Sequence, residues 1–204
     1  MAELTPEQRA FLAAHGIPLS DMFDASGMRK SDYSEAMREA GKNFAFGVSA
    51  CGKGAHTLRT RAGHCIQCDH AKIAFMIRHE APANVYIGGS LRGEHIKVGS
   101  SGLVQERRML LNSYRYGGHS DWGMLAWAFT PAAGRVEFDV HTKLARYSAP
   151  GEYWHGGVRR SCYELFKCNF DDALEALRDS LSDGVKITIP NEERAYVEYN
   201  FRQT

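Results

Sequence analysis

The chain has 204 residues, of which 44% are hydrophobic, 24% charged and 11% aromatic. This composition is typical of a globular protein and argues against a disordered, collagen-like or coiled-coil chain. The sequence lacks an apolar run long enough for a transmembrane helix, and its N-terminus lacks the features of a signal peptide, so we expect a cytoplasmic protein with no membrane partner. Five cysteines in a reducing compartment favour metal binding over a disulfide framework.

The net charge of +1 is unevenly distributed along the chain. Residues 51–119 hold ten basic and four acidic residues, a net charge of +6, whereas residues 1–50 and 120–204 are both acidic overall. A basic middle segment between acidic ends indicates a local anion-binding surface rather than a generally basic protein. On charge alone, a solvated charged face without a ligand is the commoner explanation of such a pattern.

Residues 1–46 are predicted to be a helical N-terminal region. Thr5 followed by Pro6 predicts the start of a first helix, and Ser31 predicts the N-cap of a second helix over 33–40. This region is too short to bury a large core by itself, so we expect it to pack on the next part of the chain. Because it is acidic, a docking role is favoured over contact with DNA.

Residues 47–80 carry cysteines and histidines at metal-ligand spacing. Cys65 and Cys68 form a C-x2-C knuckle, and Cys51 and His56 precede it. Thiolates two residues apart on a tight turn can reach one ion, and Zn²⁺ prefers four sulfur or nitrogen ligands in a tetrahedron. The spacing therefore predicts a closed, structural zinc site that lets this glycine-rich segment fold.

The fourth zinc ligand is left open by the sequence, because His64 and His70 compete with His56 for that place. The same module carries basic side chains that could contact phosphates while the metal fixes the loop. These candidate nucleic-acid-binding residues are Lys53, Arg59 and Arg61.

Residues 83–180 are predicted to form an α+β domain with a small antiparallel or mixed three-stranded sheet flanked by helices. β-Branched and aromatic residues indicate the strands, and polar caps indicate the helix starts. Residues 181–204 are a C-terminal extension. The predicted elements are strands over 84–88 and 95–99 in a hairpin, a helix over 105–112 with Met109, Leu110 and Leu111 inward, a third strand around Trp127, a helix after Pro131, a strand over 162–169 and a helix over 171–180.

A tyrosine, Tyr86, lies in the first predicted strand of the hairpin, and Lys97-Val98-Gly99 lies eleven residues further on in the second. Arg107 follows on the next helix, and Glu137 on the helix after the third strand. This order over residues 83–170 resembles the GIY-YIG nuclease family, in which a Gly-Ile-Tyr strand and a Tyr-Ile-Gly strand precede an essential Arg and a later essential Glu. Two departures stand out: the first motif lacks its glycine, and a lysine, which some branches of the family carry, replaces the second tyrosine.

The resemblance implies a metal-dependent DNA endonuclease, and the residues suit that chemistry. The Lys97 ammonium would favour the phenolate of Tyr86, which could act as general base for water. Arg107 offers a bidentate fork to the phosphate. Glu137 suits one Mg²⁺ or Mn²⁺ held through few protein ligands and several waters.

Further candidates are weaker. His141, one helical turn after the metal-binding glutamate, either lines the same cleft or is an exposed helix residue, and Asn169 is the nearest match to an asparagine that the family carries late in the domain. Arg108 is a candidate for nucleic-acid binding. Ser100 and Tyr116 are lesser candidates for phosphate contacts. The three tryptophans are expected in the core rather than as base-stacking platforms: Trp122, Trp127 and Trp154.

Two alternatives remain open. The chain could be a non-catalytic nucleic-acid-binding protein that uses a zinc knuckle and a degenerate nuclease fold. The substrate could instead be RNA, since DNA is favoured only through the family resemblance.

Overall fold

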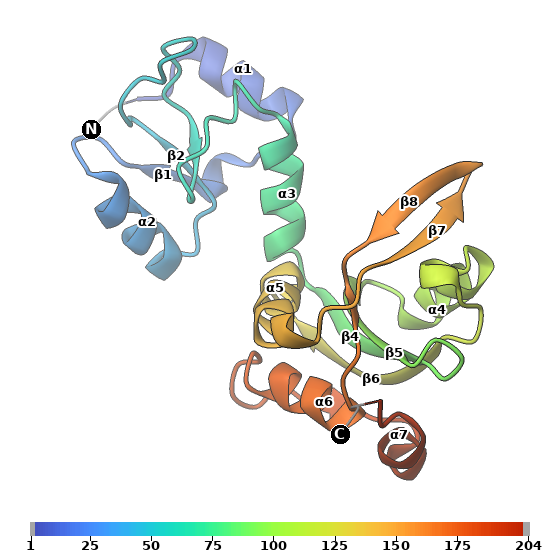
Figure 1. Cartoon of the computed structure of the whole chain (residues 1–204). Coiled ribbons are helices and arrows are strands. Elements are labelled where there is room, and N and C mark those ends of the chain that lie inside the picture. Colours follow the sequence, from blue (N-terminus) through green and yellow to red (C-terminus); the bar gives the residue numbers. More distant parts are fainter. Residues whose placement is uncertain (1–2, 202–204) are drawn as a thin grey trace. The chain divides into compact units, whose positions relative to one another are not determined.

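The computed structural model describes residues 3–201 and divides into two compact units, Met1–Arg78 and His79–Thr204 (Figure 1). Each unit combines helices with a β-sheet, so the expected α+β class is confirmed. Among residues 3–201, none of the helices has the length and apolar character needed to cross a membrane.

The first unit contains a three-stranded mixed sheet as well as helices. The strands lie in the order β1-β2-β3, with β1 parallel to β2 and β3 antiparallel to it. The region over 1–46, expected to be helical, therefore contributes two of the strands, and residues 47–78 fold onto it rather than apart from it. The elements are α1 (Pro6–Ala14), a 3₁₀ turn (Leu19–Asp21), β1 (Met22–Asp24), α2 (Lys30–Glu39), β2 (Phe44–Phe46), β3 (Arg59–Thr60) and α3 (Ala71–Glu80), whose last two residues belong to the second unit.

The predicted start of α1 is confirmed, but that of α2 is wrong. The Thr5 hydroxyl accepts a hydrogen bond from the backbone N–H of Gln8, whose side chain in turn accepts from the Thr5 N–H, which is a capping box. In α2 the N-cap is Arg29, which makes no side-chain capping bond, and Ser31 lies inside the helix. The Ser31 hydroxyl instead donates to Asp32.

The second unit is built on a five-stranded antiparallel sheet in the order β10-β6-β4-β5-β9. Its elements are β4 (Ala83–Ser90), β5 (His95–Ser101), α4 (Val104–Ser113), β6 (Gly123–Thr130), α5 (Ala133–Lys143), β7 (Gly151–His155), β8 (Val158–Cys162), β9 (Leu165–Phe166), α6 (Phe170–Arg178), β10 (Ile187–Thr188) and α7 (Glu192–Glu198), with 3₁₀ turns over Tyr116–Gly118 and Ala145–Tyr147.

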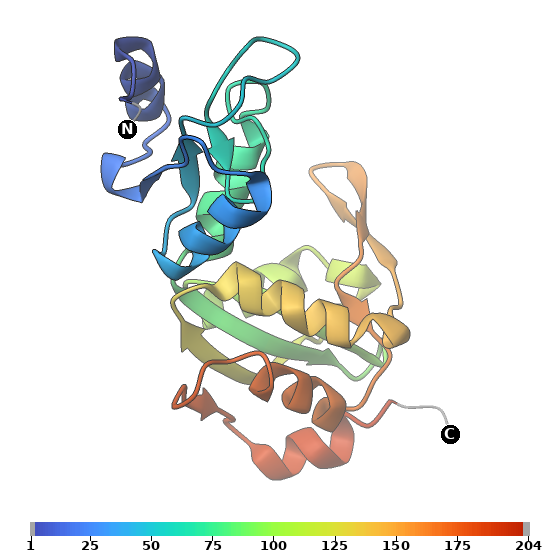
Figure 2. The ribbon, with the colours of Figure 1, turned by 90° about the vertical axis from the view of Figure 1, so that its left-hand side faces the viewer.

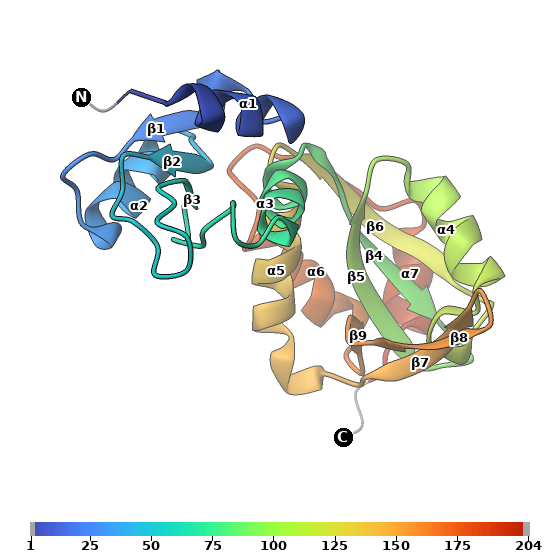
Figure 3. The same ribbon diagram turned by 90° about the horizontal axis from the view of Figure 1, so that it is seen from above.

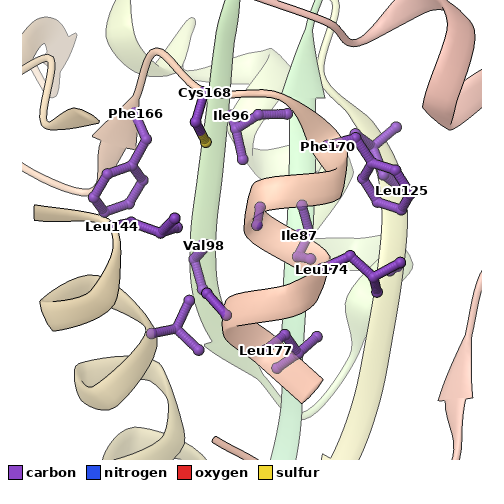
Figure 4. Close-up of a cluster of buried hydrophobic side chains, with 14 of the residues drawn as sticks. Ile87, Ile96, Val98, Leu125, Leu144, Phe166, Cys168, Phe170, Leu174 and Leu177 are labelled. Atoms are coloured by element: carbon purple, nitrogen blue, oxygen red, sulfur yellow. The ribbon is translucent and has the colours of Figure 1, made fainter. Parts of the chain in front are cut away.

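Helices cover both faces of this sheet. Within the unit, α5 and α6 lie on one face and α4 lies on the other (Figures 2 and 3). The larger core fills the α5–α6 face, where Phe170, Leu174 and Leu177 of α6 pack toward Ile87 and Val98 of the central strands (Figure 4). The α4 face holds a second cluster that includes the candidate active-site residue Tyr86.

Three expectations for this unit are corrected. The predicted sheet of three strands is extended by two short edge strands, β9 and β10, which are too brief to show a periodic pattern. The predicted strand over 162–169 is divided, because β8 pairs only with β7 in a separate hairpin. Met109 and Leu110, expected to face inward, are 59% and 41% exposed, and only Leu111 of that trio is buried.

The C-terminal extension belongs to this unit. Ala195 of α7 and Tyr199 are buried in the larger core. Residues 202–204 of the extension lie outside the described part of the chain.

Candidate functional site

Four side chains of the first unit form a cluster that could hold a metal ion. One ligand atom from each lies within 4.8 Å of the others. The Cys51 and Cys68 sulfurs are 3.6 Å apart, and His56 Nδ1 lies 3.3 Å from the Cys68 sulfur and 3.7 Å from the Cys65 sulfur. In a tetrahedron with Zn–S and Zn–N lengths of ~2.3 and ~2.0 Å, the sulfur–sulfur edge would be ~3.8 Å and the sulfur–nitrogen edge ~3.5 Å. The cluster therefore has the donor set and dimensions of a Cys3His tetrahedron.

The loop that carries the first two ligands is closed by its own backbone. The Cys51 N–H donates to the His56 carbonyl at 2.9 Å, and the Ala55 N–H donates back to the Cys51 carbonyl at 3.0 Å. Gly54 is required inside this loop, because a Cβ there would lie 2.6 Å from Cε1 of the His56 ring. The tight loop thus points the imidazole at the knuckle formed by Cys65 and Cys68.

The thiols of the cluster influence one another's protonation. The Gly54 N–H, with other backbone donors and Cys68, lowers the pKa of Cys51 to about 6. Hydrogen bonding to Cys65 and then Cys51 raises the pKa of Cys68 to about 11. One thiolate forms readily, but further ionisation is opposed by the negative charge already present. A divalent cation would remove that opposition, so the cluster suits a cation.

The competing histidines lie outside the cluster. The His64 ring faces the Thr60 hydroxyl at 3.5 Å, and the His70 ring packs against His15 with centroids 4.6 Å apart. The structure therefore assigns His56, and neither His64 nor His70, to the fourth position.

The basic residues of this unit differ in availability. Lys53 is exposed, and Arg61 is half-buried near Asn43. Arg59 is only 7% exposed, and its guanidinium donates to the carbonyls of His56, Leu58 and Ser49 at 2.8–3.0 Å. Arg59 is expected to contact phosphate, but its guanidinium instead donates to backbone carbonyls and so connects the candidate metal-binding loop to neighbouring segments.

The second unit brings Tyr86, Lys97 and Arg107 together. Tyr86 of β4 is paired with Gly99 of β5, so Lys97, two residues from Gly99, lies on the same face of the hairpin. The Lys97 ammonium is 5.8 Å from the centre of the Tyr86 ring. Arg107, on α4 above this face, donates from Nε to the Tyr86 hydroxyl oxygen at 3.1 Å.

Gly99 explains how the phenol and the ammonium meet above the strand. A Cβ at this position would lie 2.6 Å from the Tyr86 hydroxyl oxygen and 3.2 Å from Lys97 Nζ. Only glycine leaves the room that both groups occupy. This spatial requirement gives the glycine of the Lys97-Val98-Gly99 motif a physical reason.

Glu164, which no sequence pattern singles out, completes this cluster. Its carboxylate forms an ion pair with Lys97 and accepts a hydrogen bond from the Tyr116 hydroxyl at 3.0 Å. Burial favours the neutral carboxyl, but Lys97 outweighs it and lowers the pKa of Glu164. Burial opposes the charge on Lys97, yet Tyr86 and Glu164 together raise its pKa. Both partners therefore remain charged.

Tyr116 acts as a hydrogen-bond donor in this cluster. Burial and the Glu164 carboxylate raise its pKa, so the phenol keeps its proton. Its ring also lies beneath the Lys97 ammonium at 4.8 Å. This arrangement fits a residue that positions Glu164 and Lys97 better than one that contacts phosphate.

The later candidates lie at different places. Glu137 is half-buried on α5, makes no hydrogen bond or ion pair within residues 3–201, and lies near enough to raise the pKa of Lys97 slightly. His141 Nε2 lies 3.1 Å from the Val98 carbonyl of β5. Asn169 is the N-cap of α6, and this position accounts for its residue type. Arg108 is exposed on α4.

An open cavity of about 370 Å³ adjoins this cluster. It lies between the end of β5 and the start of α4, and Arg107, Glu106 and Ser100 are among its lining residues. Arg107 thus contacts the buried phenol and also lines an open cavity. No protein-family model, curated protein or solved structure matches the chain, so the assignment of a function depends on this geometry.

Proposed function

We propose that the chain is a GIY-YIG-like endonuclease that hydrolyses phosphodiester bonds of DNA, with a structural zinc ion in its first unit. The observation that carries the proposal is the contact between Arg107 and the Tyr86 hydroxyl, with Lys97 on the same face. A phenol between a guanidinium and an ammonium is an uncommon arrangement for packing alone. It suits proton transfer next to a negatively charged group.

Each residue has a role in this chemistry. Tyr86 takes the proton of the attacking water, with the Arg107 guanidinium bonded to its hydroxyl and the Lys97 ammonium beside its ring. Arg107 turns its remaining N–H groups from the phenol toward the phosphate in the open cavity. Glu164 and Tyr116 hold the Lys97 side chain in place and keep it charged.

Glu137 fits a divalent cation because its half-buried carboxylate has no hydrogen bond or ion pair within residues 3–201. A Mg²⁺ or Mn²⁺ ion bound there would supply positive charge for the leaving oxygen. In the first unit, Cys51, His56, Cys65 and Cys68 fit Zn²⁺, with no open ligand position on the protein side.

Cleavage assays test this proposal. Purified protein is incubated with supercoiled plasmid, single-stranded DNA and RNA, each with and without Mg²⁺. We expect nicking or linearisation only with the metal, and we expect Tyr86→Phe to abolish it because the ring still packs but no proton acceptor remains. Equal cleavage by Tyr86→Phe and wild type would exclude the assigned base. Cleavage of RNA alone would reassign the substrate.

One observation favours the non-catalytic alternative, a zinc-knuckle nucleic-acid-binding protein. Tyr86 is fully buried, and a general base must be reached by water. Binding of labelled DNA without cleavage, at any divalent metal tested and with both units folded, would support this second candidate.

A further inference from the structure

The hairpin of β7 and β8 presents an aromatic side chain that packing does not explain. Trp154 was expected in the core, yet it is 66% exposed and makes no ring contact within residues 3–201. In the β-register Trp154 is paired with Arg159, so the indole and the guanidinium share one face of the hairpin. An exposed aromatic alone needs no explanation, but Trp154 and Arg159 also line a groove, and that combination points to a ligand.

The hairpin is a defined platform. β7 and β8 pair over their full length, from Gly151 with Cys162 to His155 with Val158. The two-residue turn is Gly156-Gly157, with φ of 59° and 76°, which is the conformation that joins two strands most tightly. The other face is anchored on the unit, since the His155 ring packs against Tyr114 at 4.4 Å. The strand pairing therefore fixes the backbone that carries Trp154.

A groove of about 660 Å³ lies between this hairpin and the end of α4. Its volume is in the range of about 300–1,000 Å³ that is usual for small-ligand sites. The aromatic lining comes from Tyr114, Tyr153 and Trp154, and the cations are Arg115 and Arg159. Arg159 also pairs with Glu152, so Arg115, which is exposed, is the cation left for a ligand.

The groove is connected to the candidate active site by direct contact. The ring of Tyr153 in its wall lies 4.8 Å from the ring of Tyr116. The Tyr116 hydroxyl binds Glu164, which pairs with Lys97. A chain held in the groove would therefore lie next to the cluster that we assign to phosphodiester chemistry.

We propose that this groove binds an unpaired nucleotide of the nucleic-acid substrate, with its base against Trp154 and its phosphate near Arg115. The proposal rests on the proposed function, because it names the part of the substrate that this chain recognises. Aromatic faces bind bases by stacking, and arginines bind phosphates. Within a duplex both faces of a base are already stacked, so the indole favours a single strand, an overhang or an extruded base.

Binding measurements on the full chain test the proposal. The probes are a fluorescein-labelled single-stranded DNA and a blunt duplex that contains the same strand, without added divalent cation so that neither is cleaved. We expect Trp154→Ala to weaken single-strand binding about tenfold or more and duplex binding less than about twofold. Trp154→Phe should retain most of the affinity while losing the quenching of tryptophan emission on DNA addition.

Matched variants separate the groove from general surface effects. Tyr163→Ala removes another aromatic, 71% exposed, that does not line the groove, and should bind as wild type does. Arg115→Asn keeps a residue that tolerates the left-handed backbone at φ 48° and should weaken single-strand binding, whereas Arg178→Ala on α6 should not.

The outcomes distinguish the two proposals. If wild type cleaves DNA but Trp154→Ala binds single strands unchanged, or loses duplex and single-strand binding equally, the groove is not a site for an unpaired base and the nuclease proposal stands. If wild type cleaves no substrate and binds neither probe, both proposals are wrong.

Discussion

In Met1–Arg78 the strands are two or three residues long, whereas in His79–Thr204 the central strands β4 and β5 extend over eight and seven residues. The short strands cover two small hydrophobic clusters, and the long ones have helices and buried side chains on both faces. A unit of under 80 residues with so little sheet is near the limit of what a hydrophobic core can stabilise alone. We therefore expect the first unit to depend on a metal ion at its Cys3His cluster, and the second unit on apolar packing.

The two units also place polar groups differently. In the first unit, Arg59 donates hydrogen bonds to backbone carbonyls near its own loop, and the thiols gather in one cluster with His56. In the second, a rigid sheet carries the Tyr86 hydroxyl and the Lys97 ammonium at fixed positions next to a cavity. Chemistry needs precise placement, and a packed sheet provides it better than a loop.

The largest expected difference between the two units is their response to removal of the metal. A chelator, or Cys65→Ser, should unfold the first unit, because the binding energy of a structural zinc ion is folding energy. The second unit should remain folded because its core is independent. Metal analysis should find about one Zn²⁺ per chain, and limited proteolysis should degrade residues 1–78 while a fragment beginning near residue 79 survives. A chelated chain that resists proteolysis throughout would contradict this prediction.

The next largest effect is on activity and belongs to the second unit. Glu137→Ala should lower the cleavage rate on the order of 10³-fold, comparable to the loss of a main electrostatic stabiliser. Thermal unfolding should change little, because the Glu137 side chain is half-buried and has no partner within residues 3–201. Asp139→Ala, an exposed carboxylate on the same helix, is the control and should cleave normally. If both variants lost cleavage activity to the same extent, the assignment of Glu137 as the ligand of the divalent cation would be wrong.

Arg59→Ala sharpens the distinction between stability and binding in the first unit. Loss of three charge-assisted hydrogen bonds from a buried guanidinium should destabilise this unit by about 3 kcal/mol. Lys53→Ala, on an exposed residue of the same module, should leave unfolding unchanged and reduce the salt slope of DNA binding by about one. A normal unfolding curve for Arg59→Ala would mean that those contacts contribute little.

The residues show what a sequence can and cannot predict here. Cys51, Cys65 and Cys68 could be predicted because metal ligands follow local spacing. The fourth position stayed open until the structure showed that the tight loop at Gly54 places the His56 ring in the cluster. The hairpin of β4 and β5 was predictable because β-branched residues and a turn signal lie in sequence order.

Other features depend on contacts between distant segments. Glu164 is 67 residues from Lys97 in the sequence, so no local pattern predicts their ion pair. Met109 and Leu110 fit a helical pattern but lie beyond the width of the buried stripe on α4. Tryptophan is usually buried, so Trp154 was expected in the core. Its exposure follows from its place on the separate hairpin of β7 and β8.

The smallest expected effect concerns the ion pair of Lys97 and Glu164, which no local sequence pattern indicates. The pKa of Glu164 is lowered, so its contribution to stability is present above the unfolded-state value of about 4.3 and is lost as pH falls through the folded-state pKa. The pKa of Lys97 is raised, so its contribution is lost only as pH rises beyond about 10.4. The pair therefore stabilises the second unit across the whole neutral range.

The variant Glu164→Gln tests the pH range over which the ion pair stabilises the second unit. At pH 7 the variant should lose about 1–2 kcal/mol of unfolding free energy, a modest value because the Glu164 side chain is 40% exposed and solvent screens the pair. The difference from wild type should shrink below about pH 4, where the wild-type carboxylate becomes protonated as well. Asp139→Asn, on an exposed carboxylate inside α5, is the control and should unfold as wild type does at pH 7. If the Glu164→Gln difference stayed constant from pH 3 to pH 8, packing rather than charge would account for it, and Glu164 would have no electrostatic role in holding Lys97.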